Sequence, residues 1–224
     1  MKGRSHSYYM LVSSLPPLPA RFDSERLPIS LERLQGRLAM LEPEDAEETD
    51  RLFEILSWSR QFEEGHDTAV VTRYGDLMQG IRHPMIREVL LTLMDDRMIL
   101  TALRLRRRGA GPPTVGIGRW ADQIRRNFSR PDFGLGHVFP WITSFDKMLE
   151  ERDLESLHRG LMGVLWNDFK RRADNYYFSF EAVILYLARW DLIRQWQELH
   201  SDRGRAIFDN LVTEVLGEHA NIYS

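Results

Sequence analysis

Apolar residues recur at helical spacing over most of the chain, and short polar or proline-rich segments separate the periodic stretches. The first clear stripe has leucines at intervals of three and four, which predicts a helix with one apolar face. Its members are Leu31, Leu34, Leu38 and Leu41. Ser30 stands directly before the stripe and is a suitable N-cap residue. Pro43 favours the first turn of a second helix, whose early acids suit the helix dipole.

The middle of the chain predicts one long helix that starts at Pro84 and continues to the arginines near residue 108. Residues 61–74, before it, form a polar break. Glycines and prolines in residues 109–118 end the long helix and predict a connector. A short helix is expected over residues 120–128, and a loop rich in glycine and proline over residues 129–141.

Two strongly periodic stretches and one weaker one predict the helices that close the chain. Asp153 is the expected cap of the first, and Ser179 is the expected cap of the second. Their apolar stripes consist of Leu154, Leu157, Leu161, Leu165 and Phe169, and of Phe180, Val183, Leu187, Trp190 and Ile193. A last helix is expected over residues 204–216.

The N-terminal segment differs from the rest. Residues 8–12 are aromatic or apolar without interruption, and prolines follow soon after them. This pattern predicts a short buried strand or an extended arm over residues 8–13, followed by a proline-rich linker to residue 28. Five large side chains at a free terminus would otherwise leave a sizeable apolar patch exposed. We therefore expect Tyr8 to Val12 to be buried against the helices.

These patterns predict a mainly α protein, a bundle of seven to nine helices with a short N-terminal strand or extended arm. The expected organisation is an arm and linker over residues 1–28, a helical subdomain over 29–108, a connector over 109–118 and a second helical subdomain over 119–224. A single compact domain is the alternative. At 224 residues the chain is long enough for either arrangement.

Composition narrows the classes of protein only a little. The chain is 43% hydrophobic and 28% charged, with a net charge of −3, and it contains no cysteine. Disulfides, thiolate catalysis and cysteine-bound metals are excluded. The apolar run at the start is too short for an export signal, and no run reaches the length of a membrane-spanning helix. These features predict a protein that is soluble or peripheral to a membrane.

Arginines concentrate between Met98 and Arg130, a stretch with a single acid. Three interpretations remain open: favourable interaction with a helix C-terminus, docking on an acidic protein, or binding to nucleic acid or lipid headgroups. The acidic net charge and the scarcity of lysine disfavour nucleic acid. The candidate interaction residues are Arg104, Arg106, Arg107 and Arg108, with Arg125 and Arg126 expected nearby.

Aromatic residues near the C-terminus provide a second group of candidates. Trp190 and Trp196 lie on one predicted helix but point to different sides of it. Two interpretations remain open. Either both tryptophans are packed in the core, or one of them contributes to an interface together with Arg194, since tryptophan and arginine anchor many interfaces.

No catalytic, cofactor-binding or metal site is predicted. The histidines show no metal-binding spacing, and no nucleophile or phosphate-loop motif occurs. Glu63 to Asp67, "EEGHD", is the one dense group of ligand-type side chains, and a solvated loop is the simpler interpretation. Asp95 and Asp96 are adjacent on a helix and therefore diverge, which predicts an exposed pair. A helical enzyme with a polar site near Glu63 to Asp67 is the alternative class.

Three stretches resemble known families. "YYMLVSSLPPL", from Tyr8 to Leu18, resembles the start of a bacterial family that is encoded among the subunits of V-type rotary ATPases. "DDRMILTALRLRRRG", from Asp95 to Gly109, and "YFSFEAVILYLARWDLIRQW", from Tyr177 to Trp196, are more distantly similar to helices of the all-helical adaptor of those enzymes, their C subunit. Arg189, Ile193 and Arg194 match the closing helix of that adaptor.

The resemblance implies a non-catalytic subunit or assembly factor of a bacterial V-type ATPase. Such a protein would act, like the adaptor that it resembles, between the central stalk and the membrane ring, with other ATPase subunits as partners and no cofactor. It would be cytoplasmic, and peripheral attachment to the cytosolic side of the inner membrane would come through these partners.

Overall fold

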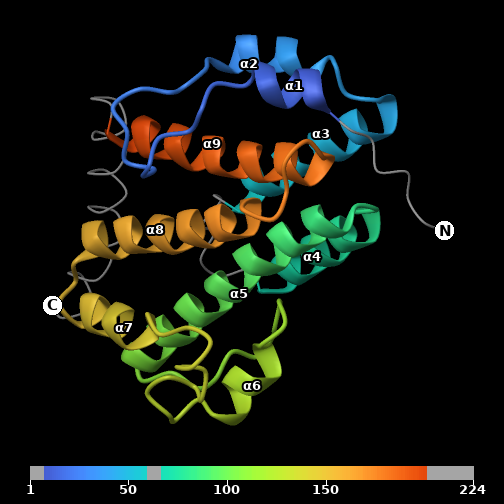
Figure 1. Ribbon diagram of the computed structural model, residues 1–224. Helices are drawn as coiled ribbons and strands as arrows, with labels where there is room; N and C mark the ends of the chain where they lie inside the picture. Colours follow the sequence, from blue (N-terminus) through green and yellow to red (C-terminus); the bar gives the residue numbers. More distant parts are fainter. Residues whose placement is uncertain (1–7, 60–66, 201–224) are drawn as a thin grey trace, which may run out of the picture.

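The computed structural model describes residues 8–59 and 67–200, which form nine helices and no strand (Figure 1). In chain order these are α1 (Tyr9–Ser14), α2 (Leu31–Leu38), α3 (Pro43–Ser59), α4 (Asp67–Gly80), α5 (Pro84–Arg107), α6 (Ala121–Arg126), α7 (Ile142–Glu150), α8 (Leu154–Ala173) and α9 (Phe180–His200). The predicted mainly α fold is confirmed. The helix expected over residues 204–216 lies outside the described residues.

Several helix starts follow the expected capping chemistry. The Ser30 hydroxyl accepts a hydrogen bond from the backbone N–H of Arg33 at 3.4 Å, and the Asp153 carboxylate accepts one from Ser156 at 3.0 Å. Pro43 and Pro84 are the first residues of α3 and α5. Ser179 directly precedes α9, but its buried hydroxyl makes no hydrogen bond in the described part of the chain.

The predicted N-terminal strand or extended arm is wrong, because residues 9–14 form α1. The backbone N–H of Tyr8 donates to the Phe178 carbonyl at 2.6 Å, and the N–H of Val12 donates to the Tyr8 carbonyl at 2.9 Å, which closes the first turn. Side chains three apart share a helix face, so Tyr8 and Leu11 both point into the core. The expected burial holds for these two residues and is wrong for Tyr9 and Met10, which are exposed.

The linker that follows α1 is packed on the last two helices. Its carbonyls accept hydrogen bonds from buried aromatic side chains: Tyr186 donates to Pro16 at 3.0 Å, and the indole N–H of Trp166 donates to Ala20 at 3.2 Å. Phe22 is buried and meets Trp196 edge to face, with ring centroids 5.2 Å apart. The linker is therefore fixed to α8 and α9 along its length.

One further predicted boundary is wrong, and one helix was missed. The polar break expected over residues 61–74 contains the first half of α4. α7 was not predicted, although it buries Ile142 and Phe145 against its neighbours. In Figure 1, α1 and α2 cover one side of α9, α8 lies beneath α9, and α6 and α7 lie at the opposite end of the molecule.

α5 runs through two hydrophobic clusters. Its first half, to Met94, belongs to a cluster shared with α1, α3, α8 and α9. Its second half, from Met98, belongs to a cluster shared with α6, α7 and the start of α8. Both clusters contain residues from before and after the connector over residues 109–118. The predicted division into two helical subdomains stays a prediction, and the buried clusters cross its border.

In the described part of the chain, every helix is too short or too polar to cross a membrane.

Candidate protein-binding surface

The start of α1 and the turn between α8 and α9 together expose four large apolar or aromatic side chains. The exposed fractions are 61% for Tyr9, 81% for Met10, 74% for Tyr177 and 42% for Phe178. The rings of Tyr9 and Phe178 are in contact, with centroids 4.8 Å apart. We call these four residues the aromatic patch. Exposed apolar side chains that gather in this way are typical of protein-binding surfaces.

The aromatic patch rests on a well-anchored support. Tyr8, directly before Tyr9, is buried; its hydroxyl donates to the Asp45 carboxylate and accepts from the backbone N–H of Glu42 at 3.2 Å. Burial, and then the hydrogen bond to Asp45, raises the pKa of the Tyr8 hydroxyl. Because Tyr8 links α1 to α3 and to the Phe178 carbonyl, the exposed side chains are presented by fixed backbone.

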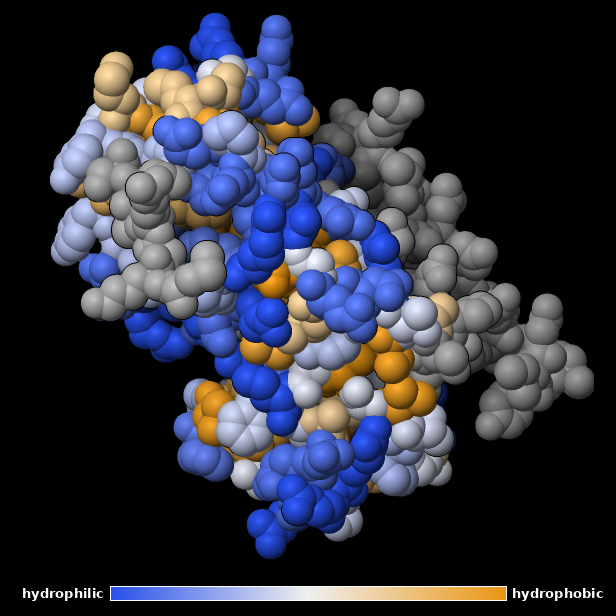
Figure 2. Space-filling model, turned by 90° about the vertical axis from the view of Figure 1, so that its right-hand side faces the viewer, coloured by the Kyte–Doolittle hydropathy of each residue, from blue (hydrophilic) through white to orange (hydrophobic). Residues whose placement is uncertain are grey.

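Figure 2 shows the side of the molecule on which the start of α1 and the turn between α8 and α9 lie. Hydrophilic side chains cover much of this side, and hydrophobic ones are exposed between them. A mixture of apolar contacts and polar surroundings is the usual composition of an interface between proteins that also exist apart.

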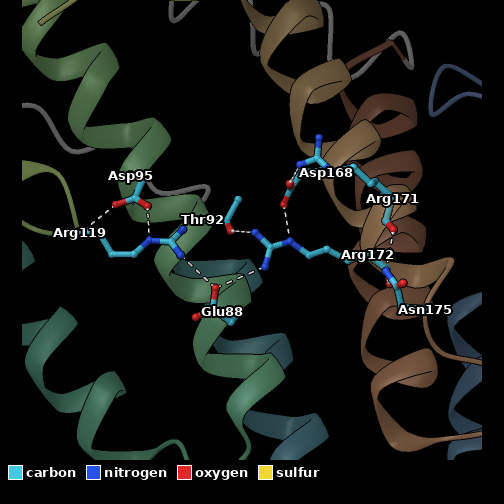
Figure 3. A network of polar contacts seen from close by, with 8 residues as sticks. All are labelled: Glu88, Thr92, Asp95, Arg119, Asp168, Arg171, Arg172 and Asn175. Carbon is cyan, nitrogen blue, oxygen red and sulfur yellow. Dashed lines mark hydrogen bonds and ion pairs between the residues drawn. The ribbon is translucent and has the colours of Figure 1, made fainter. Parts of the chain in front are cut away.

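A polar network joins α5 to Arg119, directly after the connector, and to α8 (Figure 3). Asp95 is buried and accepts from the backbone N–H of Arg119 at 2.6 Å and from its Nε at 2.7 Å. Arg119 and Arg172 both reach Glu88, at 3.0 and 3.4 Å. We call the set the α5–α8 network; its members are Glu88, Thr92, Asp95, Arg119, Asp168 and Arg172.

The connector approaches α5 closely at this network, and a glycine makes the approach feasible. Gly118 has φ +84°, and an added Cβ would lie 2.5 Å from the Asp95 carboxylate and 3.1 Å from the Asp95 nitrogen. A residue with a side chain would therefore be strained and would clash. Arg119 follows directly and places its N–H and guanidinium on Asp95.

The sequence-based prediction of an exposed Asp95–Asp96 pair is wrong, since both side chains are buried. α5 is packed against α3 and α9 on its first half and against α6 and α7 on its second, so even diverging neighbours face protein. Asp96 Oδ2 has no hydrogen-bond partner in the described structure. Burial raises the pKa of Asp96 well above its ordinary range, and the nearby charges of Asp95 and Asp168 add to the effect.

We expect Asp96→Asn to make the protein more stable at pH 7. The pKa of Asp96 is higher in the folded state than in the unfolded state, so the folded state binds more protons and stability falls as pH rises above about 4. The amide keeps the shape of the side chain without its charge. Urea unfolding at pH 7 should show a gain of about 1–3 kcal/mol, the scale of a buried unsatisfied group.

The pH dependence provides the control for this prediction. The gain from Asp96→Asn should shrink as pH falls towards about 4, where the wild-type carboxyl increasingly carries a proton in both states. Asp50→Asn, an exposed aspartate on α3, should change stability by less than about 0.5 kcal/mol at any pH. A loss of stability in Asp96→Asn at pH 7 would contradict the assignment.

Two of the candidate arginines, Arg106 and Arg107, form hydrogen bonds and ion pairs within their own chain. Arg106 donates to the carbonyls of Arg130 and Pro131 at 2.7 and 2.9 Å and pairs with Asp146 at 3.1 Å. Arg107 pairs with the same Asp146 at 2.8 Å. The two guanidinium groups therefore attach the end of α5 to the loop over residues 129–141 and to α7. Charge reversal at Arg106 or Arg107 would therefore break contacts within the chain as well as any docking on these arginines.

The remaining candidate arginines lie at the same end of the molecule. Arg125 donates to the Pro113 carbonyl at 3.1 Å and pairs with Asp122 at 3.0 Å. Arg126 is exposed and donates to the Asp122 carbonyl at 3.2 Å. Arg104 is half-buried, and Arg108 is exposed at the C-cap of α5. Docking of an acidic partner on these arginines stays a prediction.

Trp190, Arg194 and Trp196 belong to the packing of α9. Trp190 is completely buried and donates to the Ile29 carbonyl at 2.9 Å, so it is not accessible to a partner. Trp196 is also buried. Arg194 pairs with Asp191 at 2.5 Å and with Glu198 at 2.7 Å. Of the two interpretations of the tryptophans, packing is the one that the structure shows.

The metal and enzyme candidates gain no structural support. Within residues 8–59 and 67–200, no group of three or more potential ligands is placed to hold a metal ion. The "EEGHD" segment lies outside the described residues, except for Asp67 at the start of α4.

The described residues form a helical fold that exposes the apolar and aromatic side chains of the aromatic patch. The chain belongs to the family described as "Protein of unknown function (DUF2764)", whose model matches residues 71–218. No curated protein and no solved structure matches the chain.

Proposed function

We propose that this protein is a non-catalytic subunit or assembly factor of a bacterial V-type rotary ATPase. It acts as a helical adaptor between the central stalk and the membrane ring, comparable to the C subunit of those enzymes. Its contacts are with other ATPase subunits, and through them it is held on the cytosolic side of the inner membrane. The proposal starts from the N-terminal resemblance and from the likeness of residues 95–109 and 177–196 to helices of that adaptor.

The aromatic patch is the observation that carries this proposal. Its α1 residues, Tyr9 and Met10, come from the stretch that resembles the ATPase-associated family, and Tyr177 and Phe178 open the stretch that resembles the adaptor. The two stretches meet at the Tyr9–Phe178 contact. Segments from near the two ends of the chain thus form one exposed surface with the residue types that anchor protein interfaces.

We expect the double substitution Met10→Ser, Tyr177→Ser to release the protein from the ATPase. Truncating residues that are central in an interface commonly costs more than about 1.4 kcal/mol, which is about tenfold in affinity. The measurement is co-purification with a tagged ATPase subunit, followed by titration of the purified protein against the depleted complex. Both side chains are exposed, so the melting temperature of the isolated protein should not change.

A matched control removes apolar side chains from elsewhere on the surface. Met40 and Val138 are each 40% exposed and lie outside the aromatic patch. Met40→Ser, Val138→Ser should leave association intact. An ATPase that is purified intact without this protein, or binding that is equal for both double variants, would contradict the proposed function.

A further inference from the structure

A groove lies beside the aromatic patch, between the segment that follows α1 and the junction of α8 and α9. Its volume is about 270 Å³. One wall is formed by Leu15 to Leu18, and the other by residues near the end of α8 and the start of α9. Tyr177 borders the groove and is also a member of the aromatic patch. A partner that covers the patch can therefore extend into the groove without a break.

The walls of the groove are lined mostly by apolar and aromatic residues, and the wall formed by residues 15–18 is rich in proline. Pro16 and Pro17 carry no backbone N–H. The Tyr186 hydroxyl is already bonded to the Pro16 carbonyl at 3.0 Å. Leucine, proline and tyrosine side chains in such a groove suit apolar side chains of an extended segment.

Of the residues described at the groove, Arg189 is the one that carries a charge. Its Nε donates to the Leu185 carbonyl of its own helix at 3.2 Å, and its guanidinium lies 5.9 Å from the centroid of the Trp166 ring. Among the described residues no carboxylate is within ion-pair distance of it, whereas Arg194, on the same helix, has two such partners. Asp174 favours the charged form of Arg189 only from a greater distance.

The surroundings of Arg189 carry an energetic cost that a ligand would remove. Burial lowers the pKa of Arg189, because a partly desolvated cation without a counter-ion is unfavourable. A carboxylate that enters the groove would supply the missing charge and two acceptor oxygens. If Arg189 served folding alone, an acidic partner within the chain, of the kind that Arg194 has, would make the folded protein more stable.

We infer that the groove binds a segment of a partner protein in which an Asp or Glu side chain stands between apolar side chains. The carboxylate pairs with Arg189, and the apolar neighbours lie against Pro16, Pro17 and Tyr186. The choice of partner rests on the proposed function: the segment belongs to an ATPase subunit that also covers the aromatic patch. The groove thereby gives the adaptor its selectivity for an acidic-apolar sequence.

The test is selection of peptides from a random display library of short peptides on the full-length purified protein. We expect selected peptides to share an acidic residue flanked by apolar ones. Their affinity, measured by fluorescence anisotropy of labelled copies, should fall at least about tenfold for Arg189→Met, which loses the charge-assisted contact. Lys147→Met removes a positive charge from an exposed position on α7, away from α1 and α9, and should bind normally.

Two further readouts guard against loss of folding. Arg189→Met should melt no lower than the wild type, because it replaces a partly buried unpaired cation by an apolar side chain of similar length. Leu18→Glu leaves Arg189 in place but introduces a competing carboxylate on the opposite wall, and it should also abolish peptide binding. Peptides without acidic residues, affinity unchanged in Arg189→Met, or no selected peptide at all would overturn the inference.

The outcomes separate the groove from the proposed function. If the patch variants lose the ATPase while peptide selection shows no dependence on Arg189, the groove inference fails and the function stands. If acidic-apolar peptides bind through Arg189 but the protein never associates with the ATPase, the proposed function fails and the ligand chemistry of the groove stands.

Discussion

Replacing Leu11 with alanine is expected to lower the free energy of unfolding by about 2–5 kcal/mol, the range for removing a buried leucine side chain. Leu11 is 1% exposed and belongs to the larger hydrophobic cluster, although it lies in a helix of six residues near the N-terminus. So short a helix has little stability of its own, and its packing holds it in place. Urea unfolding monitored by circular dichroism measures the change.

The neighbouring residue provides a matched control for this prediction. Met10 is 81% exposed on the same helix, so Met10→Ala should change the free energy of unfolding by less than about 0.5 kcal/mol. The two substitutions separate the roles of the "YYMLVSSLPPL" stretch: Tyr8 and Leu11 attach α1 to the core, and Tyr9 and Met10 face outwards. Similar losses in both variants would show that α1 does not pack as described.

Helix starts and the long central helix were predictable because the signals are local. Ser30 and Asp153 offer an acceptor to the first turn of a helix, and Pro43 and Pro84 have the backbone angle that a first turn requires. These preferences depend on nearby atoms, which the sequence displays directly. The mainly α class followed from them and from the spacing of apolar residues.

Contacts between distant segments decided the elements that were predicted wrongly. The run from Tyr8 to Val12 suits a strand by composition, but the Phe178 carbonyl accepts the first N–H and the turn closes as a helix. α4 has a weak local signal, since Gly75 and several β-branched residues lie inside it. α7 follows a loop rich in glycine and proline, and it packs on α5 and α8, which no local pattern reveals.

The predictions of the candidate sites failed for the same reason, because contacts between distant segments decide what surrounds each residue. Exposure of Asp95 and Asp96 was inferred from their spacing, but spacing along one helix gives no information on what surrounds that helix. Arg106 and Arg107 were candidates for an interaction surface, and Asp146 lies opposite both. The aromatic patch requires α1 and the turn between α8 and α9 to meet. The sequence gives no sign of that meeting, because it depends on how distant segments pack.

Loss of the Arg119 side chain is expected to destabilise the fold by about 3 kcal/mol at pH 7, since it leaves a buried carboxylate without its cation. Asp95 is 1% exposed and, among the described residues, would keep the backbone N–H of residue 119 as its hydrogen-bond partner outside α5. We take the lower end of the usual range because that N–H remains and because the Arg119 side chain is itself 39% exposed. Arg119→Met is the variant, and urea unfolding measures the loss.

A double-mutant cycle tests whether the loss arises at Asp95. With Asp95→Asn in the same chain there is no charge to leave unpaired, so the double variant should recover most of the stability that Arg119→Met loses. The loss should also be smaller near pH 4. Burial already raises the pKa of Asp95, and removing the guanidinium raises it further, so the folded variant binds a proton that the unfolded chain has released at pH 7.

Arg126→Met, which removes an exposed arginine, should be neutral at both pH values. If Arg119→Met were as mild as Arg126→Met, the connector would be held to α5 by Ile117 and the backbone alone, and the α5–α8 network would contribute little to joining the two hydrophobic clusters.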